Sequence, residues 1–194
     1  AAMIEAAGGE ARPIGIARDT AEDLAQKFAE ADGADILVTT GGASVGDHDL
    51  VRPALEANGA KLEFYKIAMR PGKPVFFGTK GRMRVLGLPG NPLSAMIGAR
   101  VFLVPLIAKM LGRADTLATV AARLARPIPP NGPRAHYMRA ILDTTHTPPR
   151  VTPLESQDSA FVLGLAAANC LIVLPANAPA QPEGGEVAIL PLDF

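Results

Sequence analysis

The chain has 194 residues, of which 48% are hydrophobic, and its 19 lysines and arginines balance its 19 aspartates and glutamates. That much apolar material suits one large or two small cores, and a neutral chain lacks the basic excess of nucleic-acid-binding proteins. With one cysteine, Cys170, the chain forms no internal disulfide, which fits a reducing cytoplasm. No uninterrupted apolar stretch reaches about 18 residues, so we expect no membrane span.

The first part of the chain alternates between patterns typical of helices and of strands. Met3 to Ala7, followed by two glycines, is typical of the last turns of a helix, so we expect a piece of a longer protein. The later helix candidates are residues 20–31, 50–57 and 92–111, and the strand candidates are residues 13–17, 36–40, 62–68, 75–77 and 83–86. This alternation predicts a three-layer α/β sandwich with a mostly parallel sheet.

After Gly112 the pattern changes to short strands separated by proline-rich turns. The strand candidates are residues 117–124, 136–142, 170–174 and 186–190, and residues 160–168 suggest one helical turn. Short, regularly spaced strands of this kind predict a small β-barrel or sandwich. We therefore expect an α/β domain over residues 1–114 and a β-domain over residues 115–194.

Three loops of the first domain carry residues suited to an anionic ligand, which in such sheets binds beyond the carboxyl ends of the strands. The first runs from Thr40 to Asp49 and supplies free backbone N–H groups at Gly41, Gly42 and Gly46, with hydroxyls on Thr40 and Ser44. Its acids suit a divalent cation that bridges them to a phosphate. The alternative is a tight strand–helix turn in which Asp49 caps the helix.

The second loop, residues 66–74, gathers Lys66, Arg70 and Lys73 around a Pro-Gly turn. Lysine supplies a point charge, and arginine supplies a planar fork suited to two oxygens of an oxyanion. Lys66 and Arg70 lie four residues apart, which in an extended strand would place both on one face. The alternative is a solvated basic loop.

The third loop, residues 87–95, is a stiff turn because Pro89 and Pro92 flank Gly90 and Asn91. Pro92 suits the first position of a helix. The Asn91 amide and the N–H groups of the first helical turn, including that of Ser94, can point at a ligand. The alternative is an ordinary helix start. Elsewhere, the three histidines lack metal-ligand spacing, and no hydrolase elbow or Walker loop is present.

In order and spacing, these loops resemble those of the molybdopterin molybdenumtransferases, which are related to the gephyrin E domain of animals. The resemblance rests on Thr40-Gly-Gly-Ala-Ser-Val-Gly-Asp-His-Asp49, Met69-Arg-Pro-Gly-Lys-Pro74 and Gly87-Leu-Pro-Gly-Asn-Pro-Leu-Ser94. Residues 157–175 are similar to the final β-domain of that family. The resemblance implies a pterin-phosphate and molybdate site in the α/β domain.

The resemblance also implies a reaction, in which molybdate enters adenylated molybdopterin and AMP is released, with Mg²⁺ as the cation. Asp19 and Asp49 match the functional acids and would hold the metal, and Lys66 and Arg70 match a cationic pair near the oxyanion. The cofactor-binding residues would be Thr40, Gly41, Gly42, Ser44, Gly46, Lys73, Pro89, Gly90, Asn91, Pro92 and Ser94.

Members of the family begin with a dimerisation region and with a strand that opens the α/β domain, and this sequence contains neither. Homodimers and an upstream adenylyltransferase partner are implied for the complete protein. A partner subunit lines the family's cleft, so we expect this chain to bind ligands without turning them over alone. The alternatives are an adenylyltransferase of the same fold, which lacks a C-terminal β-domain, and a non-catalytic pterin-binding scaffold.

Overall fold

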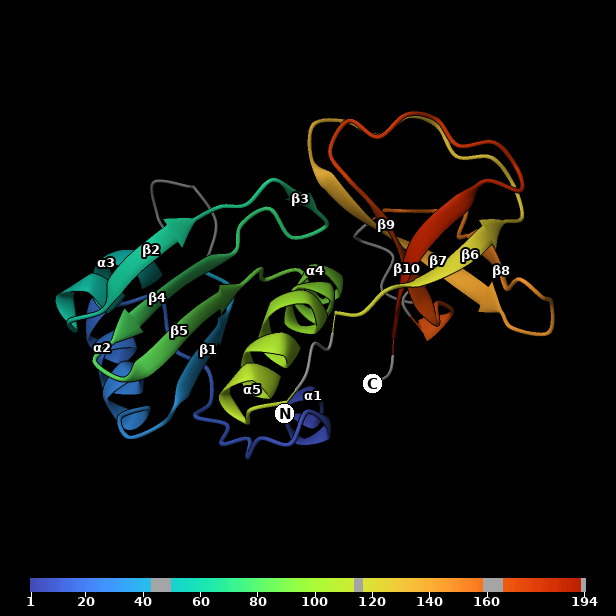
Figure 1. Ribbon diagram of the computed structural model, residues 1–194. Coiled ribbons are helices and arrows are strands. Elements are labelled where there is room, and N and C mark those ends of the chain that lie inside the picture. The colour runs from blue at the N-terminus through green and yellow to red at the C-terminus, as the bar shows by residue number, and fades with distance from the viewer. Residues whose placement is uncertain (43–49, 114–116, 159–165, 193–194) are drawn as a thin grey trace.

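The computed structural model describes residues 1–42, 50–113, 117–158 and 166–192. Its first half is an α/β domain built on one four-stranded sheet (Figure 1). The helices of this domain are α1 (Ala2–Ala6), α2 (Ala21–Glu30), α3 (Val51–Ala57), α4 (Pro92–Gly98), a π-helical segment (Ala99–Leu103) and α5 (Val104–Met110). The strands of the sheet are β1 (Ile36–Thr40), β2 (Lys61–Tyr65), β4 (Phe76–Lys80) and β5 (Met83–Leu88).

The sheet is mixed, because β4 runs antiparallel to the other three strands, which share one direction as a mostly parallel sheet requires. Its order is β1-β5-β4-β2, and β1 pairs with β5 in parallel. The other two pairings, β4 with β5 and β2 with β4, are antiparallel. Two residues between β4 and β5 suffice for a hairpin, whereas a parallel return would need a crossover of a dozen or more residues.

Helices cover both faces of the sheet and make the expected three layers (Figure 1). On one face, Leu24 and Phe28 of α2 pack with Leu55 of α3 in a single buried cluster. Thr20 caps α2, because its Oγ1 accepts a hydrogen bond from the Asp23 N–H at 3.3 Å, as its sequence pattern predicts. On the other face, α4, the π-helical segment and α5 supply a second cluster. Full burial of one aliphatic or aromatic side chain stabilises the folded state by about 1.5–3 kcal/mol.

Residues Pro92–Met110 form one 19-residue helix that is long and apolar enough to cross a membrane by length and composition alone. The uninterrupted apolar runs of the sequence predict no such segment, because Arg100 and Lys109 lie within this stretch. The helix is 56% buried inside the structure, between the sheet and the β-domain. Burial between these two layers is typical of a helix in the core of a protein.

The expected strand over residues 13–17 does not form. Ile14 packs against the core of the α/β domain, whereas Ile16 is 94% exposed. In the described part of the chain, no strand pairs with the free edge of β1, and a cavity of about 770 Å³ lies between β1 and residues 9–16. An extended segment becomes a strand only where a partner backbone is in reach, and here the cavity separates the two. That a further strand belongs to this domain stays a prediction.

The second half is a five-stranded barrel, as expected. Its strands are β6 (Val120–Leu124), β7 (Ala135–Asp143), β8 (Arg150–Pro153), β9 (Cys170–Leu174) and β10 (Glu186–Pro191). They follow the order β7-β8-β6-β10-β9, and β7 also pairs with β9, which closes the barrel. Met138, Ile172 and Ile189 fill its core together with Cys170, whose thiol is fully buried. Closure leaves this small domain without free strand edges.

One element crosses between the domains. The two-residue strand β3 (Met69–Arg70) belongs to the basic loop of the α/β domain, yet it pairs in parallel with β7 of the barrel. Figure 1 shows β3 reaching from the α/β domain to the side of the β-domain. Met69 stands opposite Ala135, and Arg70 opposite His136. The basic loop is therefore held by both domains.

Candidate functional site

The first and third loops meet at the carboxyl end of the sheet. Thr40 and Leu88 are partners in the parallel β1–β5 ladder, so the loops that follow them leave the sheet side by side. The Gly41 N–H donates to the Leu88 carbonyl at 3.1 Å. A Cβ added to Gly90 would lie 3.3 Å from the Gly41 Cα, closer than most real contacts. A side chain at position 90 would therefore press on the Gly41 backbone, whereas one at position 41 would lie at an ordinary 3.9 Å from the Gly90 Cα.

Gly42 has a different reason to be glycine. Its φ is +63°, and a Cβ there would lie 2.0 Å from a methyl group of Val51 at the start of α3. Close packing between loop and helix is therefore enough to require glycine, without a ligand. Ser44, Gly46 and Asp49, which the sequence also places in this loop, lie outside the described residues.

The basic loop joins the other two through the first turn of α4. Met69 is 3% exposed and packs in one cluster with Leu93 and Ile97 of α4. A Cβ on Gly72 would lie 3.8 Å from the Ser94 carbonyl oxygen, so the Pro-Gly turn rests on the helix start. The described parts of all three loops thus converge at one end of the sheet, as their sequence positions predict.

The cations of the basic loop are arranged differently from the expectation. Lys66 and Arg70 do not share a strand face, because β2 ends at Tyr65 and Lys66 takes a left-handed φ of +83°. Such a backbone is rare outside glycine and persists only where surrounding contacts hold it. Here the Lys66 N–H donates to Val75 at 2.9 Å and the Ile67 N–H to Lys73 at 3.1 Å, which closes the loop. The side chains of Lys66 and Lys73 are exposed and form no ion pair with a described residue.

Arg70 contacts the barrel. Its Nη2 lies 2.9 Å from His136 Nδ1, and because a guanidinium has no acceptor, Nη2 donates and Nδ1 accepts. His136 is only 3% exposed. Burial, followed by the positive charges of Arg70, Arg139 and Arg134, lowers its pKa from 6.5 to about 4. The imidazole is therefore neutral near pH 7 with its proton on Nε2, and four of the five donors of Arg70 stay available.

Arg139, three residues further along β7, is 1% exposed and holds the segment that follows β8. Its Nη2 donates to the carbonyl oxygens of Ser156 and Asp158, each at 3.0 Å. The Gln157 side chain bonds both the N–H and the carbonyl of Arg139, again at 3.0 Å. Sequence reasoning missed His136 and Arg139. The sequence does show these two polar residues inside an otherwise apolar strand pattern. That pattern identifies neither the residues that they contact nor their role.

The third loop behaves as a helix cap. Asn91 Oδ1 accepts the Ser94 N–H at 3.0 Å, and Pro92 is the first residue of α4. Ser94 is 6% exposed. The expectation that the Ser94 N–H points at a ligand is wrong, because the cap uses that donor. Pro89 is buried, whereas Gly90 and Pro92 are exposed, so these two residues are the part of this loop that faces outward.

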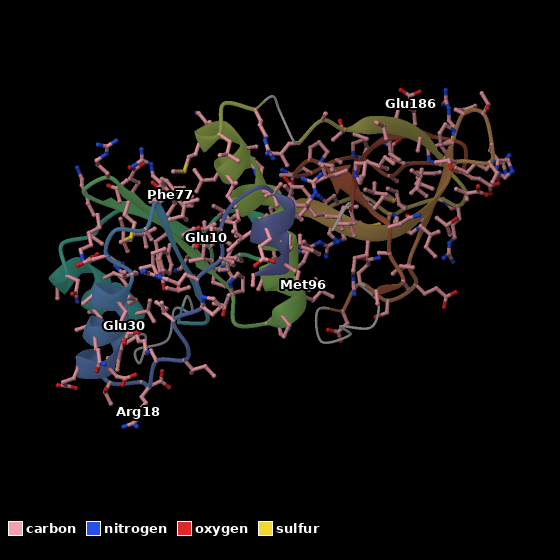
Figure 2. All side chains as sticks on the ribbon, turned by 90° about the horizontal axis from the view of Figure 1, so that it is seen from below. Glu10, Arg18, Glu30, Phe77, Met96 and Glu186 are labelled. Carbon is pink, nitrogen blue, oxygen red and sulfur yellow. The ribbon has the colours of Figure 1, made fainter. Side chains whose placement is uncertain are left out.

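The acids do not form a complete metal site in the described residues. Asp19 is exposed in the turn before α2, and it forms no hydrogen bond or ion pair with another described residue. Figure 2 shows its neighbour Arg18 at the outer rim of the α/β domain, projecting away from it. Across residues 1–42, 50–113, 117–158 and 166–192, no group of three or more His, Cys, Asp or Glu could hold a metal ion. Asp49, the second expected ligand, lies outside these ranges.

Comparison with known proteins matches both halves of the chain. The family described as "Probable molybdopterin binding domain" matches residues 1–109, and that described as "MoeA C-terminal region (domain IV)" matches residues 121–192. The molybdopterin molybdenumtransferase of Bacillus subtilis (strain 168) is 33% identical over 157 residues, which are 80% of this chain and 36% of that protein. The enzyme of the same name from Staphylococcus aureus (strain Mu50) is 31% identical over 80% of this chain and 38% of its own length.

Among solved structures, the molybdopterin biosynthesis moea protein from Pyrococcus horikosii has a TM-score of 0.80 and 28% identity, covering 98% of this chain and 46% of its own. A molybdenum cofactor biosynthesis protein from Pyrococcus furiosus has a TM-score of 0.77 at 20% identity, covering 97% of this chain and 61% of its own, which supports the fold alone. The chain spans a little over a third of the curated relatives named above, 36% and 38% of their lengths.

Proposed function

The chain belongs to the molybdopterin molybdenumtransferase family, and from this premise we propose that it binds adenylated molybdopterin and molybdate and serves their conversion to molybdenum cofactor, with release of AMP. The barrel favours this reaction over that of the adenylyltransferase, which lacks a C-terminal β-domain. In a complete protein, activity would further require the regions that this chain does not span.

One observation carries the proposal: three loops, each with its own ordinary explanation, converge at the carboxyl end of one sheet. Gly41 lies beside Gly90, and Gly72 lies beside the first turn of α4. In such sheets, this end is where ligands bind. Independent solvated turns would have no reason to meet there.

The residues of this end suit two anionic substrates. Lys66, Arg70 and Lys73 place three positive charges on one closed loop. Neither lysine is neutralised by a described carboxylate, and the one described partner of the Arg70 side chain is a neutral imidazole. Molybdate and a pterin phosphate are both anions that such charges attract. Fixed positive groups that need not reorganise around the reacting anion lower the barrier by positioning and electrostatics.

We propose Mg²⁺ as the cation, held by Asp19 and Asp49. Of these two acids the described residues contain only Asp19, so they do not by themselves fit a metal site. We also propose that the complete protein is a cytoplasmic homodimer that receives its pterin substrate from a molybdopterin adenylyltransferase. Sedimentation of the complete protein and a binding assay with the adenylyltransferase test these two proposals.

The central test is a molybdate titration of wild type, Arg70→Ala and Arg70→Lys by calorimetry, with binding of adenylated molybdopterin measured in parallel. Loss of one charge-assisted contact raises the dissociation constant for molybdate by about tenfold, and lysine is the milder change because it keeps the charge. Arg82→Ala is the matched control, since Arg82 is an exposed arginine in the β4–β5 turn, at the opposite end of the sheet. Equal affinity in wild type and Arg70→Ala would assign the loop to the pterin phosphate or to solvent.

A further inference from the structure

The contact between Arg70 and His136 joins two segments that are 66 residues apart. Two features define it. The backbones of Arg70 and His136 are paired in the β3–β7 ladder, so their side chains lie on the same side of the sheet. The Nη2–Nδ1 distance of 2.9 Å then completes a hydrogen bond between a loop of the α/β domain and a buried side chain of the barrel. The position of the guanidinium is thus set from outside its own domain.

The chemical nature of the acceptor matters, because a buried partner of arginine is more often a carboxylate. A carboxylate would hold the guanidinium and also cancel its charge. His136 is surrounded by Arg70, Arg134 and Arg139, and its burial together with these charges keeps it neutral. A neutral acceptor orders Arg70 and leaves its full positive charge facing outward.

We propose that His136 is a positioning residue for the oxyanion site: it accepts a hydrogen bond from Arg70 and so holds the arginine, still fully charged, at the loop where molybdate binds. This inference rests on the proposed function and adds a role for the β-domain. An arginine side chain carries much rotational freedom, and fixing it before the anion arrives removes about 0.5–1.5 kcal/mol of ordering cost from binding. That range corresponds to an affinity gain of about two- to tenfold.

The contact has a competing explanation as simple packing between the domains. Packing predicts that substitutions of His136 change stability and leave anion affinity alone once the protein is folded. Positioning predicts that the affinity for molybdate depends on whether the side chain at position 136 has a hydrogen-bond acceptor, and not on its bulk. Asparagine keeps an acceptor oxygen near the place of Nδ1, whereas leucine keeps bulk without an acceptor.

The first experiment compares molybdate binding by wild type, His136→Asn, His136→Leu and the control His146→Leu, whose histidine is an exposed residue of the β7–β8 turn. We expect the leucine variant at 136 to bind molybdate about two- to tenfold more weakly, the asparagine variant to stay near wild type, and the control to be unchanged. In an Arg70→Ala background, His136→Leu should have no further effect, because His136 acts through Arg70. Equal affinity of wild type and a folded His136→Leu, or an undiminished effect in the Arg70→Ala background, would overturn the inference.

The second experiment needs no anion and separates this inference from the proposed function. The side-chain ¹⁵N signals of Arg70 should show hindered rotation in wild type and His136→Asn, and averaged rotation in His136→Leu. Acidification of wild type through a pH of about 4 should release Arg70 as His136 gains a proton, while circular dichroism checks that the protein stays folded. If the Arg70 side chain is restrained but the chain binds no molybdate, the proposed function is refuted, while the hydrogen bond from Arg70 to His136 stands. An Arg70 that rotates freely in wild type would refute the positioning role even where molybdate binds.

Discussion

Burial of a neutral histidine makes the stability of the barrel depend on pH in a defined window. In the folded protein, the pKa of His136 is lowered from 6.5 to about 4 by burial and by its arginine neighbours. Between these two values the unfolded chain binds a proton that the folded chain does not. Stability contributed by the neutral imidazole is therefore present above pH 6.5 and is lost as the pH falls towards about 4.

The size of this loss follows from the same two values. They differ by about 2.5, which corresponds to about 3 kcal/mol at about 1.4 kcal/mol for each pH unit. Domains of this kind are stable by about 5–15 kcal/mol, so the loss is a large share of the total. Below a pH of about 4 both states bind the proton, and this contribution changes no further.

The assay uses the fact that the chain has two tyrosines and no tryptophan. Tyr65, which stacks on Phe76 in the α/β domain, can be replaced by phenylalanine without loss of its ring. Tyr137, on β7 and half-buried, then reports unfolding of the barrel and of its contact with Met69 and α4. Urea unfolding of Tyr65→Phe is measured from pH 7 to pH 4, with and without His136→Asn.

The histidine-containing protein should lose about 3 kcal/mol more than the His136→Asn protein across this range. The comparison removes contributions from other groups, such as Asp143, whose pKa is lowered first by the hydroxyl of Thr145. Parallel stability curves for the two proteins would refute the reasoning. They would mean that His136 takes up its proton in the folded barrel near its ordinary pKa.

Three further predictions concern the loops. Gly90→Ala places a methyl group 3.3 Å from the Gly41 Cα, so we expect molybdate and pterin binding to weaken by about tenfold, with a stability change below about 1 kcal/mol. Calorimetry measures the affinities and urea unfolding measures the stability, and a loss of stability alone would contradict the shared site. Asn91→Ala removes the cap on the Ser94 N–H and should cost about 1 kcal/mol, with little change in anion affinity; a large affinity loss would assign Asn91 to the ligand. Asp49→Asn should weaken Mg²⁺ binding and leave pterin binding in place, because the glycine-loop donors remain; equal loss of both would count against a metal role.

Local patterns were sufficient for the elements whose contacts are local. The α2 helix follows from the Thr20 cap and from the four-residue spacing of Leu24 and Phe28, and the structure buries both side chains. The β4–β5 hairpin follows from its short glycine-containing turn, and the barrel from short strands between prolines. In each case the signal and its cause lie within a few residues of each other.

The failures share the opposite property. Residues 13–17 have the composition of a strand, but a strand also needs a partner backbone, and in the described structure β1 lies across a cavity from them. Lys66 was expected to continue β2, whereas hydrogen bonds to Val75 and Lys73 close the loop and turn its backbone left-handed. Hydrophobic periodicity indicates which face of a helix or strand is buried. It contains no information about which distant segments of the chain contact that element.

The same limit explains why the sequence places the candidate site in one domain, whereas in the structure its basic loop contacts both domains. Metal-ligand spacing is a local criterion, and by this criterion His136 does not stand out among its apolar neighbours. Its role depends on β3, a two-residue strand whose pairing with β7 no strand pattern could indicate. Once that pairing exists, a single buried nitrogen is enough to order Arg70. A substitution in the barrel that slipped the β7 register by one residue would turn position 136 to the other face and remove the acceptor from Arg70, with every residue of the basic loop unchanged.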